Sequence, residues 1–361
     1  MFHVMRNKRY SGTEGELVKL LLRSLGQRLP SSWTVEPTRR DRGVRWDAVI
    51  RIRQKGQPPG EICVEVRKSL DPKDVPRLVE QARENARGMS VLFAAGFLSP
   101  QTRRRLTEAG ASYVDATGNL RVALDQPALF IESTGADKNP ARENRPLASL
   151  KGPAAGRVVR ALADFAPPYG VREIATRSRS PLGSVARVVA LLDREAVLTR
   201  NPRGGIETVD LPALIRRWTQ DYSLMRSNVT STYLEPREIA ALLERLQRFR
   251  GPYAITGSLA ATTLAPTAAA RLAVLFVEDP PEAAQALGLR PAEAGANVVL
   301  GRPFDPVVFE RGFTVKKVRY ACPSQVAADL LTSPGRGPAE AEALLLWMEE
   351  NPDAWRPKTL R

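Results

Sequence analysis

Arginine and serine side chains that can bind a nucleic acid gather between residues 171 and 210. Guanidinium groups suit phosphate oxygens and guanine edges, and serine hydroxyls can pair with any base or with a phosphate. The residues predicted to contact DNA are Arg177, Arg179, Ser180, Ser184, Arg187, Arg200 and Arg203. Ser184 and Arg187 are the predicted base readers, and the other arginines are expected to hold phosphates.

Apolar spacing predicts the helices that would position these side chains. Val171, Ile174 and Ala175 recur at helical spacing and indicate a short first helix. Ser180 followed by Pro181 is a typical helix start, because the serine hydroxyl can accept a free backbone N–H and proline suits the first helical turn. The second helix is expected to bury Leu182, Val185, Val188, Val189 and Leu192.

Two short strands are predicted over residues 197–200 and 206–210, joined by the turn-forming sequence Asn-Pro-Arg-Gly-Gly at 201–205. The order helix, turn, helix, strand, hairpin and strand is typical of a winged helix-turn-helix, whose second helix enters the major groove. The sequence therefore predicts double-stranded DNA as the partner. A helical packing unit that does not touch DNA is the alternative, since it can share this order of elements.

The charge balance supports a polyanionic partner. Lys and Arg total 54 residues against 39 Asp and Glu, which gives a net charge of +15. An anionic membrane surface is the weaker alternative. No stretch approaches the roughly 20 continuous apolar residues of a membrane span, and the N-terminal residues lack the apolar core of a signal peptide. The expected location is the cytoplasm, with no membrane partner.

The scarcity of histidine and cysteine excludes several enzyme classes. His3 is the only histidine, which removes Ser-His-Asp and Cys-His catalysis and histidine-based metal sites. Cys63 and Cys322 are the only cysteines, and both are expected to be core thiols because their neighbours are apolar and strand-forming. No cofactor is predicted, and any catalysis would depend on carboxylates, lysine or arginine.

Changes in composition predict an α/β multidomain chain. The expected parts are a first domain over residues 1–132, a polar, proline-bearing linker over 133–153, a second domain over 154–224 and a third over 225–361. The first domain is expected to alternate helices over 14–29, 75–87 and 100–109 with strands over 45–53, 61–68 and 90–95 and two extended runs within 112–124.

Two carboxylates of the first domain suggest metal chemistry. Asp47, followed later by Glu65 and Arg67, resembles the metal-binding pattern of the restriction-endonuclease-like superfamily. The resemblance implies that Asp47 and Glu65 hold a divalent metal such as Mg²⁺, with Glu16 and Gln81 able to complete its surroundings.

This sequence departs from that pattern at the superfamily's lysine. Arg67 stands in its place, and alternation along a strand directs Lys68 to the opposite face. Two interpretations stay open. One is a Mg²⁺-dependent DNase that uses Asp47, Glu65 and Arg67 for catalysis and the winged helix for targeting. The other is an inactive domain in which these three residues form surface ion pairs.

The third domain contains another pattern associated with enzymes. A strand over residues 253–256 runs into Gly257 and Ser258, a small-residue helix follows, and a second strand is expected over 272–277. This order resembles the minimal nucleotidyltransferase, in which paired carboxylates on the second strand bind metals. Here Glu278 and Asp279 arrive only at the end of that strand, so the domain is expected to be inactive. Nucleotide sensing is the alternative use. Further helices are expected over 211–222, 235–250 and 339–350.

Four segments together resemble AbiEi-like type IV antitoxins and related bacterial transcriptional regulators. They are YVDATGNL at 113–120, the winged helix, TGSLAA at 256–261, and QVAADLL with PGRG between 325 and 337. The resemblance implies autoregulatory DNA binding and opposition to a nucleotidyltransferase toxin without a stable complex. Those antitoxins usually carry the winged helix near the N-terminus, whereas here an endonuclease-like domain precedes it. A solitary regulator of the same group is the alternative, and paired half-sites would imply a homodimer.

Overall fold

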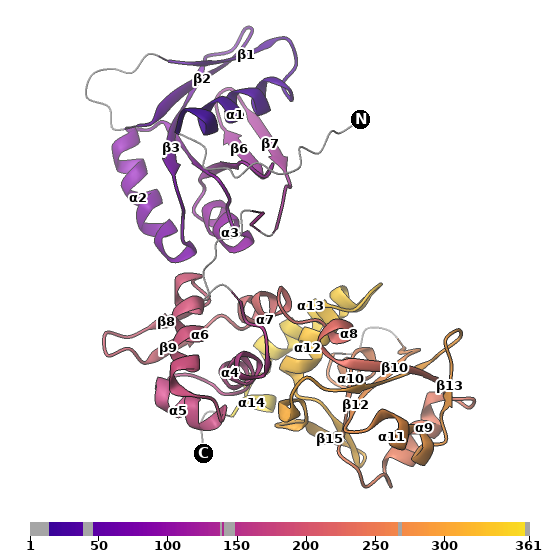
Figure 1. Ribbon diagram of the computed structural model, residues 1–361. Helices are drawn as coiled ribbons and strands as arrows, with labels where there is room; N and C mark the ends of the chain where they lie inside the picture. Colours follow the sequence, from indigo (N-terminus) through magenta and orange to yellow (C-terminus); the bar gives the residue numbers. More distant parts are fainter. Residues whose placement is uncertain (1–13, 39–45, 138, 141–148, 266–268, 358–361) are drawn as a thin grey trace. The chain divides into compact units, whose positions relative to one another are not determined.

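The computed structural model describes residues 14–38, 46–137, 139–140, 149–265 and 269–357. The fold is mixed α/β, as expected, and the chain forms two compact units (Figure 1). The first unit comprises residues 1–145 with 194–196, and the second comprises 146–193 with 197–361. The predicted Asp47–Glu65 region lies in the first unit, and the predicted DNA-contacting residues lie in the second.

The first unit is built on a seven-stranded sheet whose strands follow one another in chain order. The strands are β1 Trp33–Pro37, β2 Ala48–Gln54, β3 Gly60–Arg67, β4 Ser90–Ala95, β5 Ser112–Asp115, β6 Leu120–Leu124 and β7 Leu129–Ser133. The central strands β3, β4 and β5 run parallel, and the other neighbours pair antiparallel. The central parallel strand β4 is an almost continuous apolar run, as expected of a strand that is covered on both faces.

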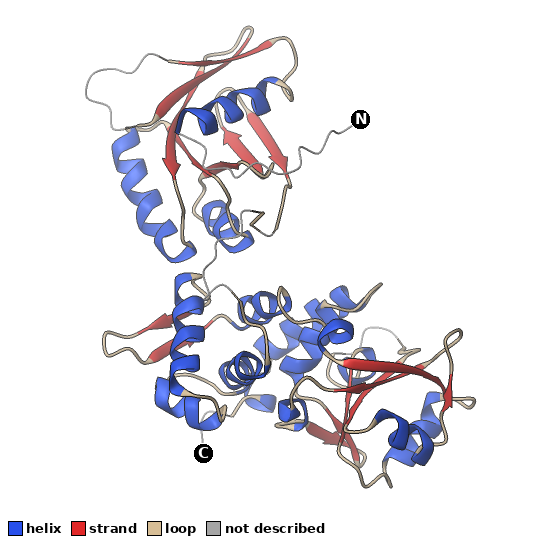
Figure 2. Cartoon of the chain, in the orientation of Figure 1, coloured by secondary structure: helices blue, strands red, loops and turns tan. Residues whose placement is uncertain are grey.

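Helices cover the two faces of this sheet (Figure 2). They are α1 Glu14–Gly26, α2 Val75–Ala86 and α3 Pro100–Glu108, with a 3₁₀ turn η1 at Pro72–Asp74. Leu17, Leu21 and Leu25 of α1 share a core with Ile50 on one face. Residues of α2 and α3 form a separate core with Cys63 on the other face. The apolar spacing of α1 therefore directs these three leucines towards the sheet.

The second unit contains eleven helices among the residues described there. They are α4 Pro153–Asp164, α5 Val171–Arg177, α6 Leu182–Arg194, α7 Leu211–Thr219, α8 Leu224–Ser227, α9 Ile239–Leu246, α10 Ser258–Ala261, α11 Pro280–Ala286, α12 Pro323–Leu331, α13 Gly337–Glu350 and α14 Pro352–Trp355. A 3₁₀ turn, η2, covers Pro306–Phe309. Helix α4 was not predicted, and residues 235–250 form only the short α9 instead of one long helix.

The strands of the second unit form a small hairpin and a mixed sheet. The hairpin is β8 Leu198–Arg200 with β9 Ile206–Val209. The sheet has the order β13-β10-β14-β12-β11-β16-β15. Its strands are β10 Val229–Leu234, β11 Tyr253–Thr256, β12 Ala273–Val277, β13 Arg290–Pro291, β14 Val298–Arg302, β15 Phe313–Val315 and β16 Val318–Tyr320.

One continuous hydrophobic core joins the helical part of the second unit to its sheet. It extends from Leu150, just before α4, to Met348 in α13. Trp218 and Tyr222 stack at 4.6 Å between ring centroids, and Phe304 packs against both. Residues 154–224 and 225–361 were expected to be separate domains, but they share this core.

The first part of the expected linker packs on the first unit. The backbone N–H of Gly135 donates to Asn119 Oδ1 at 2.8 Å, and Arg103 pairs with Asp137 at 2.6 Å. Residues 141–148, in the middle of that predicted linker, lie outside the described part of the chain.

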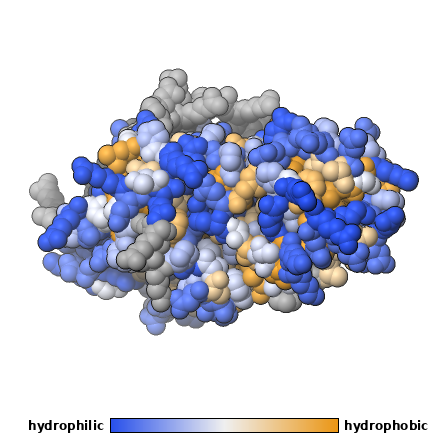
Figure 3. All heavy atoms as spheres, turned by 90° about the horizontal axis from the view of Figure 1, so that it is seen from below, coloured by the Kyte–Doolittle hydropathy of each residue, from blue (hydrophilic) through white to orange (hydrophobic). Residues whose placement is uncertain are grey.

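No helix among the described residues is long and apolar enough to cross a membrane. Hydrophilic side chains cover most of the face seen in Figure 3, where hydrophobic ones appear in separate groups.

Candidate nucleic-acid interface

Residues 171–209 form the predicted succession of helix α5, turn, helix α6 and hairpin β8–β9. Helix α5 begins at Val171, where the Glu173 side chain accepts a hydrogen bond from the Gly170 backbone N–H. Helix α6 follows a four-residue connection. The hairpin is fixed to the chain before α5, because Tyr169 and Ile206 exchange backbone hydrogen bonds of 3.1 and 2.9 Å.

The connection between α5 and α6 is a tight turn in which Arg179 adopts a positive φ of 45°. The backbone N–H of Ser178 donates to Ile174 O at 2.8 Å, and that of Ser180 donates to Ala175 O at 3.1 Å. These bonds close the last turn of α5 around a left-handed residue, a position at which glycine is usual. The turn is therefore set by backbone hydrogen bonds, while the Arg179 side chain points outward with 82% of it exposed.

Replacing Arg179 with glycine is expected to leave the free energy of unfolding unchanged or raise it by up to about 1 kcal/mol, because glycine removes the left-handed strain. The Arg179–Glu310 pair that is lost is exposed and 3.6 Å long, so it contributes little. Chemical denaturation of the two proteins measures the difference. Arg179→Ala keeps the strain and should show no such gain; a stability loss above about 1 kcal/mol in Arg179→Gly would contradict the interpretation.

Ser180 lies inside the protein. Its residue exposure is 7%, and its hydroxyl donates to Ser178 O at 3.0 Å. The same hydroxyl accepts a long hydrogen bond of 3.4 Å from Arg157 Nε. Ser180 is therefore too buried to contact a ligand directly, unlike the other predicted contact residues. Its hydrogen bonds hold the turn against α4.

Helix α6 buries one face and exposes the other. Val185, Val189 and Leu192 are fully buried, as predicted from their spacing. Leu182 was expected to lie with them but is 48% exposed, since it occupies the first position of the helix. The outward residues in the first half of the helix are Leu182, Gly183, Ser184, Ala186 and Arg187, with Ser184 half-buried. The outer face thus combines small residues with one arginine and one leucine. The arginine was predicted there, but the exposure of Leu182 was not.

Arg187 and Ser184 lie together on this face. Arg187 Nη2 donates to Ser184 Oγ at 3.1 Å, one helical turn away. The remaining N–H groups of the guanidinium stay available for a planar double-acceptor partner such as a guanine edge. The two predicted base readers are therefore brought together at the N-terminal half of α6.

The hairpin carries two further predicted arginines, Arg200 and Arg203. Asn201 Oδ1 accepts from the backbone N–H groups of Arg203 and Gly205 at 3.1 and 2.9 Å, which closes the turn. Arg200 donates to Gly204 O at 3.0 Å and lies along the hairpin. Arg203 is exposed near the tip, where its side chain can reach outward.

Arg177 is half-buried, with its guanidinium carbon 5.9 Å from the centroid of the Phe165 ring. Arg311 contacts the same ring at 5.4 Å. Arg177 is therefore held more tightly than Arg179, and it is the less accessible of the two predicted phosphate ligands on the α5 side.

A buried ionic cluster, centred on Arg160 and Asp164 of α4, lies next to the α5–α6 turn. Arg160 in α4 is fully buried and donates to Asp164 Oδ2 at 3.1 Å and to Glu310 O at 3.1 Å. It also donates to Val307 O at 3.3 Å and Gln325 Oε1 at 3.1 Å. Because Glu310 in turn pairs with Arg179, the cluster links α4 and the segment after η2 to the α5–α6 turn. No local pattern in the sequence indicates this cluster, since its members come from four distant segments.

Asp164 is the buried anion of the cluster. Burial favours a raised pKa for this carboxyl, but the guanidinium groups of Arg160 and Arg311 together outweigh burial and hold the pKa below its ordinary value. Arg311 Nε donates to Asp164 Oδ2 at 2.7 Å, and Ser324 donates through its hydroxyl. Asp164 is therefore ionised in the folded protein.

Asp329 in α12 belongs to the predicted nucleotidyltransferase-like part. It accepts hydrogen bonds from the Tyr222 hydroxyl at 2.6 Å, the Thr256 hydroxyl at 2.5 Å and Gln325 Nε2 at 2.9 Å. Burial raises the pKa of Asp329 to about 6 despite these donors. Thr256 directly precedes Gly257 and Ser258, so this Gly-Ser turn lies beside a buried and fully occupied carboxylate. The end of β11 and the Gly-Ser turn after it are therefore accounted for by packing and hydrogen bonding inside the protein.

The predicted metal residues of the first unit are engaged with protein groups. Asp47 Oδ2 accepts from the Val66 backbone N–H at 2.6 Å, and Glu65 forms an ion pair with Arg67 on the same strand face. Among the described residues, no three His, Cys, Asp or Glu side chains form a group that could hold a metal. Glu16 and Gln81 lie on α1 and α2, whose cores occupy opposite faces of the sheet. Glu65 and Arg67 thus form one of the ion pairs expected on this surface, and Asp47 accepts a hydrogen bond from a backbone N–H.

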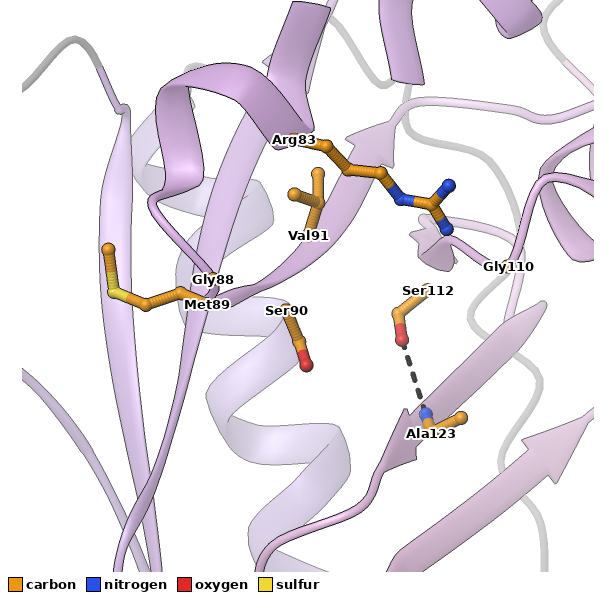
Figure 4. Close-up of a pocket in the computed structure, with 8 residues that line it drawn as sticks. All are labelled: Arg83, Gly88, Met89, Ser90, Val91, Gly110, Ser112 and Ala123. Carbon is orange, nitrogen blue, oxygen red and sulfur yellow. Dashed lines mark hydrogen bonds between the residues drawn. The ribbon is translucent and has the colours of Figure 1, made fainter. Parts of the chain in front are cut away.

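A cavity of about 200 Å³ lies in the first unit, where β4 and β5 begin (Figure 4). Arg83 from α2 reaches across it and donates to Ala109 O at 2.5 Å, and Ser112 Oγ accepts from the Ala123 backbone N–H at 3.2 Å. Small-molecule sites usually exceed about 300 Å³ and collect several polar groups. The strongest candidate for a functional site is therefore the outer face of α6 with the hairpin β8–β9.

Comparison of the chain with protein families, with curated proteins and with solved structures gives no match.

Proposed function

We propose that the protein is a sequence-specific, double-stranded DNA-binding transcriptional regulator whose second unit carries a winged helix-turn-helix. The observation that carries the proposal is the outer face of α6, where Arg187 and Ser184 lie 3.1 Å apart among small exposed residues. Small residues let a helix backbone approach base edges, and an arginine beside them can pair with guanine. This geometry favours DNA binding over a purely packing role.

In this proposal Arg187 and Ser184 read bases from the major groove. Leu182, exposed at the start of the same helix, adds an apolar contact suited to a thymine methyl group. Arg179 and Arg203 hold phosphates on either side, and Arg200 positions the hairpin through its bond to Gly204. Arg177 contributes mainly through its electric field, since it is held against Phe165.

The resemblance to AbiEi-like antitoxins extends the proposal to autoregulation. In that extension the protein represses its own promoter as a homodimer on paired half-sites and opposes a nucleotidyltransferase toxin without forming a stable complex with it. The extension depends on the sequence resemblance, whereas the proposal of DNA binding depends on the surface of α6.

The proposal is tested by titrating fluorescently labelled DNA from upstream of the protein's own gene with the full-length protein at several salt concentrations. The logarithm of the association constant should fall linearly with the logarithm of salt concentration, because phosphate contacts release counterions. Arg203→Ala should reduce the magnitude of that slope by about 0.9 and weaken binding similarly on every duplex.

Arg290→Ala is the matched control, since Arg290 is exposed in β13, away from the hairpin. It should keep the wild-type slope. A wild-type constant independent of salt, or an Arg203→Ala protein that behaves as wild type, would contradict the proposal. Cleavage of the DNA in the presence of Mg²⁺ that disappears in Asp47→Ala would establish the nuclease alternative instead.

A further inference from the structure

The hairpin β15–β16 ends in two lysines held in an unfavourable backbone conformation. Val315 pairs with Val318, so Lys316 and Lys317 are the two turn residues, with φ of 47° and 64°. Two-residue turns with positive φ at both positions favour Asn-Gly, because a Cβ atom and a long side chain are disfavoured there. The fold alone therefore does not explain this choice of residues, and a retained outlier of this kind points to function.

Further exposed cations lie on β16 and on the chain that follows α9, to which β16 is hydrogen-bonded. The set, here named the hairpin patch, consists of Arg248, Arg250, Lys316, Lys317 and Arg319, all exposed. Arg319 Nη2 donates to Gly251 O at 2.5 Å, and its guanidinium carbon lies 4.3 Å from the centroid of the Tyr253 ring. Arg319 thereby fixes the hairpin to the chain that follows α9. Within the patch, Arg319 is held by these two contacts, and the two lysines are placed by their turn.

The hairpin patch is connected closely to the α5–α6 turn. Arg179 in that turn pairs with Glu310, and Lys316 follows Glu310 by six residues. A chain spans at most about 3.6 Å per residue, so the Cα atoms of Glu310 and Lys316 are at most about 22 Å apart. One turn of duplex DNA is about 34 Å long. A duplex bound at the α5–α6 turn is therefore long enough to reach the hairpin tip within one helical turn.

Backbone conformation distinguishes two residues of the patch, Lys316 and Lys317, and two further arginines on the path from the patch to the α5–α6 turn. Among the residues that the structure describes, six non-glycine residues have positive φ, and five of them are arginine or lysine. Four of those five are Arg179, Arg311, Lys316 and Lys317, which lie along this path from the α5–α6 turn to the hairpin tip. Positive charge has thus been placed where glycine or asparagine would fold more easily.

We propose that the hairpin patch is a second DNA-binding site, in which Lys316 and Lys317 bind backbone phosphates of the same duplex that α6 reads. The inference rests on the proposed function and adds a contact outside the helix-turn-helix. Lysines at a protruding turn bind phosphates without base specificity, so the patch contributes affinity and salt dependence and leaves sequence preference to α6.

The test uses the full-length protein and a 36-base-pair duplex containing the upstream DNA. The variant K316N/K317G supplies the turn sequence that this backbone favours and removes both charges. We expect a thermal midpoint equal to or above that of wild type, a salt slope reduced in magnitude by about 1.8, and affinity weakened on the order of ten- to a hundredfold at 0.1 M salt. K316R/K317R keeps the charges and should bind as wild type does.

Each remaining outcome overturns the inference. K316N/K317G could retain the wild-type slope while Arg187→Ala loses sequence preference, in which case the patch fails and the proposed function stands. If the wild-type protein shows no salt-dependent binding to the duplex, both fail together. If K316N/K317G binds the duplex normally but loses binding to a single-stranded RNA of equal length, the partner of the patch is RNA and not the regulated DNA.

Discussion

Replacing Arg187 with alanine is expected to weaken binding to the upstream duplex by about 1–3 kcal/mol, or about 5- to 150-fold. The loss follows from removing a guanidinium that lies on the exposed face of α6 beside Ser184. A base reader also changes specificity, so the ratio between the affinities for the upstream duplex and for a scrambled duplex should fall. Anisotropy titration with both duplexes at one salt concentration measures this ratio.

Arg172→Ala is the matched control for this prediction, because Arg172 is exposed on α5 and is not a predicted reader. It should leave the ratio of the two affinities unchanged. An equal loss on the upstream and scrambled duplexes in Arg187→Ala would assign Arg187 to phosphate binding. Unchanged binding to both would remove α6 as the reading helix.

Replacing Arg160 with methionine is expected to lower the free energy of unfolding of the second unit by about 3–5 kcal/mol. The substitution leaves Asp164 with one buried cationic partner fewer and removes the donor for Glu310 O, Val307 O and Gln325 Oε1. For a unit of this size the loss corresponds to a fall in the thermal midpoint on the order of 10 °C. Calorimetry of the full chain, with the transition assigned by a DNA-dependent shift, measures the change.

Arg216→Met provides the comparison, since Arg216 pairs with Glu342 at the surface and both side chains are more than a third exposed. Its effect should stay within about 0.5 kcal/mol. If Arg160→Met were no more damaging than Arg216→Met, the buried cluster would not hold α4 against the segment after η2.

Strong local signals allowed much of the fold to be predicted from sequence. Strand β4 has the predicted bounds, and α5, α6 and the hairpin β8–β9 occur within a residue or two of their expected places. Helix α4 was missed although its apolar spacing is amphipathic. Nine of its twelve residues are buried, and among them are Arg160 and Asp164, whose residue types usually lie at the surface.

The types of residue at the candidate surface could be predicted from the sequence, but the burial and the contacts of each side chain were harder to predict. Arg187, Ser184 and Arg203 lie at positions consistent with their expected roles, since helix periodicity and turn chemistry decide those. Ser180 and Arg177 differ because Ser180 packs against α4 and Arg177 against Phe165, contacts that depend on tertiary structure. Leu182 was assigned to the buried face by periodicity, but the first turn of α6 extends beyond the core that would cover it.

The two cysteines are divided between the two units, Cys63 in the first and Cys322 in the second, and both are free and buried. Burial raises the pKa of Cys63 to about 11 and that of Cys322 to about 12, so neither is a thiolate at neutral pH. A thiol reagent can modify either one only after its unit opens. The chain therefore contains one natural chemical reporter in each unit, and the labelling rates of Cys63 and Cys322 would time the opening of the two units separately within a single sample.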